Sequence, residues 1–326
     1  MALQRTFKLN SGYAIPAIGL GTWQSAPNEV EAAVIEALKV GYRHIDAAAI
    51  YGNEAEVGRG IKKSGVPRSE IFITGKLWNT DHEPCRVEAA VDETLRDLQT
   101  DYLDLFLIHW PVPLRYTPDK SQPVNAETGL IDVIDVPDEV TWAAMEELVS
   151  KGKVRSIGVS NFTRERIEHI SKTAKIVPAV NQIEAHPYLQ QRDLLSWAQE
   201  NGIVIAGYSP LGNNIYSIPR AVDDPVVVET AKALGKSPAQ LLISWAVQRG
   251  TVVLPKSVTA SRIADNFEDF EVPKWAFEKI YNLEKHMRMN FPARIGIDIF
   301  GEVGEESAKQ SARDWAEAQK KLQATA

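Results

Sequence analysis

The chain has 326 residues, of which 44% are hydrophobic and 24% are charged, so it can bury a large core. A net charge of −7 argues against a nucleic-acid-binding surface, no apolar run approaches the length of a membrane span, and the first residues lack the apolar stretch of a signal peptide. The single cysteine, Cys85, excludes an internal disulfide and a cysteine-based metal cage. We therefore expect a cytoplasmic protein, a monomer or a weak homodimer, that binds neither nucleic acid nor a membrane.

The chain opens with a predicted β-hairpin and continues with short β-branched runs that alternate with amphipathic patterns. Residues 6–9 and 14–18 form the hairpin. The strands and helices predicted after it are, in chain order, strand 17–21, helix 28–40, strand 43–47, helix 53–63, strand 71–76, helix 83–98, strand 103–109, helix 138–150, strand 154–160, helix 164–173, strand 179–184, helix 190–201, strand 204–208, helices 225–234 and 238–249, and strand 252–255.

Eight strands separated by helices predict a closed (β/α)8 barrel, because parallel neighbours are joined by right-handed crossovers. An open dinucleotide-binding sheet is disfavoured, because Gly19 and Gly21 are not followed by a third glycine at the required spacing. No low-complexity linker divides the chain. We therefore expect one domain over residues 1–326, with the barrel over about 14–285 and a tail over 286–326.

Three segments outside the strand and helix pattern have predicted places. The hairpin would plug the mouth opposite the substrate side. The long loops 110–137 and 211–224 follow strands at the carboxyl end of the barrel and would lie on the substrate side. In the tail, the apolar and aromatic stretch 290–300 precedes an Ala/Glu/Lys-rich segment that we predict to be a solvated helix.

Four polar residues stand at or just after the ends of successive predicted strands. Asp46 ends the second strand and Tyr51 follows five positions later, whereas Lys76 and His109 end the third and fourth strands. The carboxyl ends of barrel strands converge on one pocket, so these side chains can meet despite their separation in sequence. The pattern predicts an active site.

The residue types suggest carbonyl reduction. A phenol, with an ordinary pKa near 10, is a poor proton donor at neutral pH unless its phenolate is stabilised. Lys76 can stabilise it, Asp46 can hold the lysine charged and oriented, and His109 can donate a hydrogen bond to a substrate oxygen. Hydride would then reach the carbonyl carbon while Tyr51 protonates the developing alkoxide.

The sequence resembles the aldo-keto reductases from the hairpin to about residue 285. The resemblance implies that Tyr51 is the general acid, that Lys76 and Asp46 tune it, and that His109 orients the carbonyl. One departure is Gly75, where many members carry Ser or Thr before the lysine. The motifs that carry the resemblance are Gly19-Leu20-Gly21-Thr22-Trp23, Asp46 to Tyr51 with Gly52-Asn53-Glu54, Lys76-Leu77-Trp78, His109-Trp110-Pro111, Gly158-Val159-Ser160-Asn161-Phe162, Asn181-Gln182, Tyr208-Ser209-Pro210-Leu211-Gly212 and Pro255-Lys256-Ser257.

The resemblance also implies a nicotinamide coenzyme site. Tyr208 would stack on the nicotinamide ring, and Ser160, Asn161 and Gln182 would bind its carboxamide. The other implied contacts are Gly21, Thr22 and Trp23, which would line the same cavity, and Ser209 and Leu211, which would cover the pyrophosphate.

Residues after the last strand indicate that the coenzyme is NADPH. Arg262 and Asn266 are spaced by four on a predicted helix, so they share a face. A lysine, hydroxyl groups, an arginine and a helix N-terminus suit the extra phosphate of NADP. Asp265 and Asn266 would face the adenine. The remaining residues of this predicted site are Lys256, Ser257, Val258 and Thr259.

The substrate is predicted to be a small aldehyde or sugar. Trp23, Ile50, Trp78 and Trp110 would build an apolar wall, closed by the loop after Trp110 and by the tail near 291–300. The tail resembles fungal glycerol dehydrogenases and glyceraldehyde reductases, which implies reduction of short hydroxyaldehydes or aldoses to polyols. Pentose reductases, acting on xylose or arabinose, and uronate reductases are the alternatives. Asn290, Arg294 and Asp298 could add polar contacts for hydroxyl groups.

Two functions of other classes are compatible with a barrel. Some aldo-keto reductases serve as NADPH-sensing auxiliary subunits of ion channels, although the intact set of four polar residues disfavours that role here. A metal-dependent hydrolase would need several inward-facing His and carboxylate ligands, which the six histidines do not supply.

Overall fold

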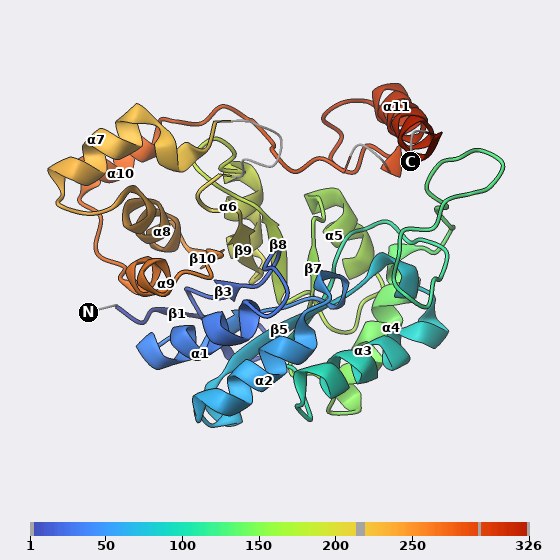
Figure 1. Cartoon of the computed structure of the whole chain (residues 1–326), viewed down its shortest axis with the longest axis horizontal. Helices are drawn as coiled ribbons and strands as arrows, with labels where there is room; N and C mark the ends of the chain where they lie inside the picture. The colour runs from blue at the N-terminus through green and yellow to red at the C-terminus, as the bar shows by residue number, and fades with distance from the viewer. Residues whose placement is uncertain (1–2, 213–218, 293–294, 325–326) are drawn as a thin grey trace.

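The computed structural model describes residues 3–212, 219–292 and 295–324 and contains a barrel of eight parallel strands (Figure 1). Each strand pairs with the next along the chain, and the first and last are joined by parallel bridges from Ile18 to Val253 and from Gly21 to Lys256. The predicted (β/α)8 barrel is confirmed. Its strands are β3 (Leu20–Gly21), β4 (His44–Asp46), β5 (Phe72–Leu77), β6 (Leu105–Ile108), β7 (Ile157–Ser160), β8 (Val180–Glu184), β9 (Val204–Tyr208) and β10 (Thr251–Leu254).

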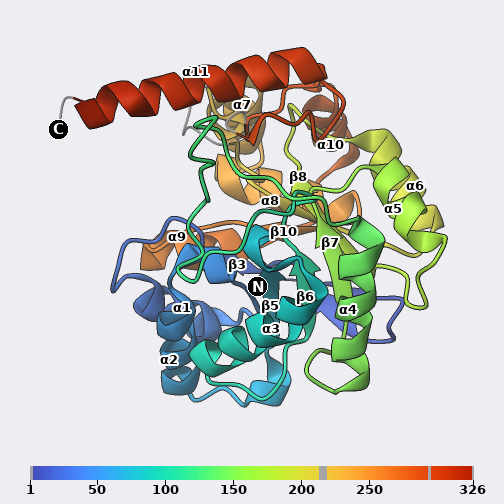
Figure 2. The same ribbon diagram turned by 90° about the vertical axis from the view of Figure 1, so that its right-hand side faces the viewer.

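The helices surround the barrel and differ from the predicted ranges by only a few residues at their ends (Figures 1 and 2). The helix at 274–281 is one that the sequence pattern did not predict. Among the described residues, no helix combines the length and the apolar character needed to cross a membrane. The helices are α1 (Val30–Val40), α2 (Glu54–Ser64), α3 (Pro84–Leu98), α4 (Asp138–Ser150), α5 (Arg164–Ser171), α6 (Arg192–Glu200), α7 (Pro225–Ala233), α8 (Pro238–Gln248), α9 (Ala260–Phe267), α10 (Lys274–Tyr281) and α11 (Glu305–Ala324).

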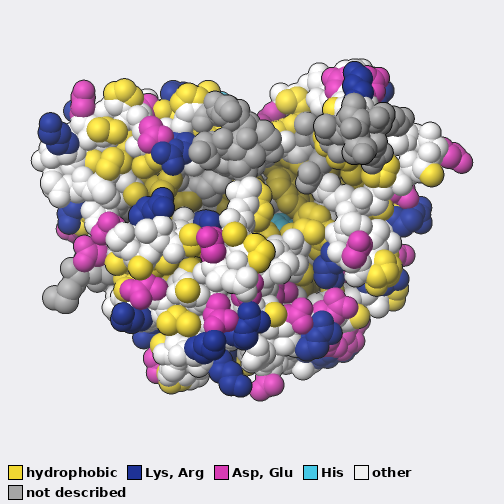
Figure 3. All heavy atoms as spheres, in the orientation of Figure 1, with side chains coloured by type: hydrophobic (Ala, Val, Ile, Leu, Met, Phe, Trp, Pro, Cys, Tyr) yellow, Lys and Arg dark blue, Asp and Glu magenta, His cyan; other side chains and the backbone are white. Residues whose placement is uncertain are grey.

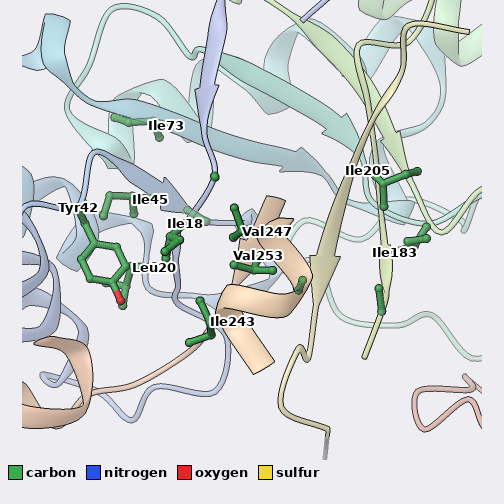
Figure 4. Packing of buried hydrophobic residues seen from close by; sticks show 14 of the residues in the cluster. Ile18, Leu20, Tyr42, Ile45, Ile73, Ile183, Ile205, Ile243, Val247 and Val253 are labelled. Carbon is green, nitrogen blue, oxygen red and sulfur yellow. The ribbon is translucent and has the colours of Figure 1, made fainter. Parts of the chain in front are cut away.

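The predicted N-terminal hairpin is confirmed as the antiparallel pair β1 (Thr6–Lys8) and β2 (Ala14–Pro16). Ile15 of β2 and Leu9, which directly follows β1, are buried in a cluster with residues of β5, β6 and β8 to β10, such as Leu107. A second, larger cluster lies between the barrel and its helices, where Ile18 and Val253 lie near Val247 of α8 (Figure 4). These two apolar layers hold the strand ends in fixed positions.

The C-terminal segment packs against the long loop that precedes α4. Its helix α11 is where the sequence predicted a helix, but the expectation that it would be fully solvated is wrong. Ala308, Ala312 and Ala316 are buried, and Trp315 packs against an apolar cluster formed with the loop before α4. Both ribbon views place α11 beside that long loop (Figures 1 and 2).

Candidate active site

The four polar residues predicted to form the site stand at the carboxyl ends of three neighbouring strands. Asp46 is the last residue of β4, Lys76 is next to last in β5, and His109 directly follows β6. Tyr51 ends a short 3-10 turn after β4. Because β5 pairs in parallel with both β4 and β6, the three strand ends lie side by side.

The ammonium of Lys76 lies at the centre of a buried hydrogen-bond network. Its Nζ donates to Asp46 Oδ1 at 2.6 Å, to the carbonyl of Ala47 at 2.9 Å and to Tyr51 Oη at 3.3 Å. These contacts use the three N–H donors of an ammonium group. Since Lys76 and Asp46 are both buried, each charge needs the other, and the ion pair fixes Nζ beside the phenol.

Burial determines the protonation of the phenol and of the imidazole. The pKa of Tyr51 lies well above its ordinary value because burial disfavours the phenolate, and the carboxylates of Asp46 and Glu54 add to this shift. The pKa of His109 lies well below its ordinary value because burial and the charge of Lys76 disfavour the imidazolium. Burial also lowers the pKa of Lys76, opposed by Asp46. Tyr51 is therefore a protonated donor at neutral pH, and His109 is a neutral imidazole.

The ring of His109 stands edge-on to two aromatic rings of the site. Its centroid lies 5.7 Å from that of Tyr51 and 5.4 Å from that of Trp78. Nδ1 is enclosed and has no hydrogen-bond partner among the described residues. Nε2 is therefore the ring nitrogen available to bind a ligand. A neutral imidazole that carries its proton on Nε2 can donate a hydrogen bond to a carbonyl oxygen.

Two residues predicted to bind the carboxamide form a hydrogen-bonded chain that ends on the carboxylate of Asp46. Gln182 Nε2 donates to Asp46 Oδ2 at 2.8 Å, and Ser160 Oγ donates to the carbonyl of Gln182 at 2.8 Å. With Lys76 on its other oxygen, Asp46 is held from both sides. The sequence pattern gave no signal for this bond, because the two residues are 136 positions apart.

Asn161 and Tyr208 form a second pair in the same wall. Tyr208 Oη donates to Asn161 Oδ1 at 2.8 Å, and Asn161 Nδ2 donates to the carbonyl of His109 at 2.9 Å. Asn161 and Ser209 both have a left-handed φ, 64° and 53°, which is uncommon outside glycine. Strained backbone of this kind concentrates at functional sites. The ring of Tyr208 is thus held in a fixed orientation against the cavity.

These groups surround one cavity of about 1120 Å³, and Figure 3 shows the hollow with hydrophobic walls and a histidine at its floor. Lys76 lies behind Tyr51 and Asp46 and does not line it. The predicted site residues that line the cavity are Gly21, Thr22, Trp23, Asp46, Ile50, Tyr51, Trp78, His109, Trp110, Ser160, Asn161, Gln182, Tyr208, Ser209, Leu211, Lys256, Ser257, Arg262, Asp265 and Asn266.

One end of the cavity is cationic. Lys256 Nζ donates to the carbonyl of Gln24 at 3.0 Å, and Arg262 Nη2 donates to Thr259 Oγ1 at 2.7 Å. Thr259 precedes α9, and its side chain does not cap the first backbone N–H groups of that helix. Two cations beside these N–H groups suit an anion such as a phosphate. Thr259 itself does not line the cavity, and Val258 packs against the apolar core instead.

Several lining residues were missed by sequence reasoning. The first turn of α8 contributes three, Ser237, Pro238 and Ala239, which follow the polar loop after α7. The Ser-Pro-x-Gln pattern there marks a helix start, but nothing in it marks a cavity. Gln122, from the long loop before α4, and Trp315, from α11, also line the cavity. No local pattern distinguishes these two from surface residues.

The tail is fastened to the barrel by a buried carboxylate. Glu184, the last residue of β8, accepts hydrogen bonds at 2.8 Å from the backbone N–H groups of Met289 and Asn290, and its Oε1 lies 2.9 Å from His186 Nε2. Burial alone would raise the pKa of Glu184, but these bonds hold it below its ordinary value. Asn290 lines the cavity, so Glu184 helps to form its wall from behind.

Of the two other polar tail residues named from the sequence, only Asp298 lies among the described residues, and it does not reach the cavity. Asp298 accepts backbone hydrogen bonds from Glu302, Val303 and Gly304, just before α11. It does not line the cavity. Arg294 lies outside the described residues.

Comparison with known proteins shows the family of the chain. The sequence matches the aldo/keto reductase family over residues 17–287, most of the chain. The chain belongs to this family. It is therefore an oxidoreductase of the aldo/keto reductase type, and the resemblance inferred from its motifs is confirmed.

Relatives of established name share nearly half of its residues. It is 46% identical to a D/L-glyceraldehyde reductase of Hypocrea jecorina, with 96% of this chain and 99% of that protein covered. It is 48% identical to an aldehyde reductase of Saccharomyces cerevisiae, with 86% of this chain and 91% of that protein covered. Among solved structures, the aldose reductase of Schistosoma japonicum is 41% identical with a TM-score of 0.85, covering 91% of this chain and 99% of that chain.

The residue at which this aldo-keto reductase departs from the expected motif lies in a tight space. A Cβ atom added to Gly75 would lie 3.0 Å from Leu103 Cδ1 and 3.3 Å from Thr94 Cγ2. Real Cβ contacts are rarely that short, so a Ser or Thr here would require these neighbours to shift. The glycine thus matches its surroundings on the helix side of β5.

Proposed function

We propose that this aldo-keto reductase uses NADPH to reduce short hydroxyaldehydes or aldoses to the corresponding alcohols, and that it runs the reverse reaction with NADP⁺. The observation that carries the proposal is the buried contact of Lys76 with both Asp46 and Tyr51, beside a neutral His109, at the floor of a large cavity. A protonated phenol next to a fixed ammonium is suited to donating a proton to a developing alkoxide.

Groups that line the cavity support the choice of NADPH as the coenzyme. The ring of Tyr208, fixed by Asn161, would pack against the nicotinamide, and Lys256 with Arg262 would bind the extra phosphate at the N-terminus of α9. When bound, the coenzyme supplies the hydride. The extra phosphate of NADPH carries about two negative charges, so two cations and backbone N–H groups can bind it strongly. NADH has a neutral hydroxyl group at the same position, which gains much less from these cations.

The residues of the chain supply the proton and the orientation. His109 donates from Nε2 to the carbonyl oxygen and holds it near Tyr51 Oη. As the carbonyl carbon is reduced, Tyr51 gives its proton to that oxygen, and the phenolate left behind is stabilised by Lys76. Asp46 keeps Lys76 charged and in place, because its two oxygens are held by Lys76 and Gln182.

The lining of the substrate half supports a short, polar aldehyde. Trp23, Trp78 and Trp110 give it apolar walls, whereas Gln122 and Asn290 place amide groups in the same space. Amides can bind the hydroxyl groups of a polyol precursor, and tryptophan faces pack against its C–H surfaces. The names of the glyceraldehyde and aldehyde reductase relatives support the same class. Pentose or uronate reduction would use the same groups.

The proposal is tested by following NADPH oxidation with glyceraldehyde, xylose, arabinose and glucuronate. The wild-type chain is expected to reduce at least glyceraldehyde. Tyr51→Phe is expected to lower kcat by about 10²- to 10⁴-fold, the usual contribution of a positioned proton donor, with NADPH affinity unchanged. Retained turnover in Tyr51→Phe would reject the phenol as the acid. NADPH binding without turnover of any aldehyde by the wild type would favour the sensor role instead.

A further inference from the structure

The C-terminal helix α11 is docked on the protein by one narrow face. Ala308, Ala312 and Ala316 recur every four residues, which places them on one side of the helix, and their exposed fractions are 0%, 1% and 6%. Small side chains on that side allow α11 to approach the tail closely. At Gly296, for example, an added Cβ atom would lie 3.1 Å from Ala312 Cβ. The helix is therefore seated in a defined position.

The segment before α11 is fastened as well. Asp298 accepts the backbone N–H groups of Glu302, Val303 and Gly304, and the carboxylate of Glu302 forms two hydrogen bonds with the guanidinium of Arg288, at 2.9 Å and 2.7 Å. A bidentate pair and a cap of this kind fix the direction in which the helix leaves the tail.

Trp315 occupies the place where this docked helix meets the cavity. It follows the buried Ala312 by three residues, so the docked face carries it toward the protein. Its side chain lines the same cavity as Tyr51 and His109. It also packs against an apolar cluster with Trp110 and Phe300, whose rings lie 6.3 Å apart.

The wall of the cavity thus continues from the catalytic floor to α11. Trp110 directly follows His109, Phe300 contacts Trp110, and Trp315 completes the same cluster from a different element. Figure 2 shows α11 lying across that end of the molecule, above the long loop that precedes α4. An indole held in this way presents a broad, rigid surface to whatever extends outward from the reacting carbonyl.

We propose that Trp315 is a specificity-determining residue, which limits the length of the aldehyde by closing the substrate pocket from the C-terminal helix. The inference rests on the proposed aldehyde reduction. A three-carbon aldehyde is enclosed by the indole and the walls around Trp110, whereas a longer one must share the space that Trp315 fills. Removing the indole opens that space and removes a surface against which the short substrate packs.

The test compares kcat/KM with NADPH for aldoses of three to six carbons in the wild type and in Trp315→Ala. The ratio of the six-carbon to the three-carbon value is expected to rise by about tenfold or more, since a single methylene in an apolar pocket already discriminates by about 10- to 200-fold. Each substrate is compared between variant and wild type, so its open-chain fraction cancels. The loss on glyceraldehyde is expected in KM, with NADPH affinity unchanged.

Trp275→Ala is the matched control, because Trp275 on α10 is 45% exposed and does not line the cavity. Ala312→Arg is a second variant, which leaves Trp315 in the sequence but forces α11 off its seat. It is expected to reproduce the length profile of Trp315→Ala. Circular dichroism and thermal unfolding verify that the barrel remains folded in each variant.

The outcomes separate the two proposals. An unchanged length profile in both Trp315→Ala and Ala312→Arg overturns the specificity role, as does a loss of equal size for every chain length. If the wild type reduces none of the aldoses or simpler aldehydes, the proposed function is wrong. That outcome is distinct from an unchanged length profile, which rejects only the role of Trp315.

Discussion

The two sides of the cavity are built in different ways. On the catalytic side, Asp46, Lys76 and His109 stand at the ends of paired barrel strands, and their positions follow from the sheet. On the substrate side, the wall comes from a loop and from the C-terminal tail, including Gln122 and Trp315.

This difference separates chemistry from selectivity. The strand ends are held by backbone pairing and by two apolar layers, so the proton-transfer groups stay fixed. The tail is held by a small number of side-chain contacts, chiefly through Glu184 and the docked face of α11. Changes on the catalytic side should therefore lower kcat, whereas changes on the substrate side should act on KM and on substrate choice.

The largest effect should come from breaking the catalytic side at Lys76. In Lys76→Met the buried carboxylate of Asp46 loses its partner and the phenolate of Tyr51 loses its stabilising charge. We expect kcat to fall by about 10²- to 10⁴-fold, and the free energy of unfolding to fall by about 3–5 kcal/mol. Steady-state NADPH oxidation and urea unfolding measure the two. Lys63→Met, on the exposed face of α2, is the control and should keep the kcat of the wild type. A wild-type kcat in Lys76→Met would contradict the role assigned to Lys76.

A smaller effect is expected at the cationic end of the cavity, which belongs to neither the catalytic side nor the substrate side. Arg262→Ala should weaken NADPH binding by about 10- to 100-fold, the value of a hydrogen bond between charged groups, and should leave NADH binding nearly unchanged. Dissociation constants for both coenzymes, measured by fluorescence titration, test this. Equal losses for the two coenzymes would show that Arg262 does not contact the extra phosphate.

Weakening the contact between Glu184 and the tail should change substrate binding and leave the chemical step unchanged. In Glu184→Gln one backbone N–H from the tail faces an amide nitrogen instead of a carboxylate oxygen, so the wall around Asn290 loosens. We expect KM for glyceraldehyde to rise by about tenfold, as for the loss of one hydrogen bond to a charged group, with kcat and NADPH affinity nearly unchanged. Glu200→Gln, at the exposed end of α6, is the control. A fall in kcat without a change in KM would refute the separation of the two sides.

The last expected effect is on stability and leaves turnover unchanged: it is a pH dependence that comes from the buried His82, just after β5. Burial lowers the pKa of His82 from 6.5 to about 3, so between these values the unfolded chain binds a proton that the folded chain does not. The stabilising effect of a neutral His82 is therefore complete above pH 6.5 and is lost as the pH falls toward 3. The free energy of unfolding should decrease by about 1.4 kcal/mol per pH unit from this residue.

His82→Gln should remove that contribution, which urea unfolding between pH 6.5 and pH 4.5 can measure. Glu54, whose burial raises its pKa from 4.5 to about 7, changes stability in the opposite direction over the whole of this range. It is present in both proteins, so the difference between their slopes isolates His82. Identical slopes would mean that His82 is not buried as described.

Much of the fold and the catalytic set could be predicted from the sequence. Local periodicity gave the eight strands and their helices, and the order of the chain gave the barrel. Asp46, Lys76 and His109 could be chosen because the position of a residue at the end of a barrel strand already determines the direction in which it points, and Tyr51 because it follows the end of β4 by five residues. These inferences need only the hydrophobic pattern of neighbouring residues and the general rule that the carboxyl ends of barrel strands converge on one pocket.

The remaining features were decided by tertiary structure. Gln182 binds Asp46 only because closure of the barrel brings β8 opposite β4. The sequence alone placed the helix of α11 but not its buried face, because alanines among charged residues look the same on a solvated helix and on a docked one. Whether Trp315 faces open water or the cavity depends on contacts between residues far apart in the chain, and those contacts form only when the whole barrel and its tail have packed.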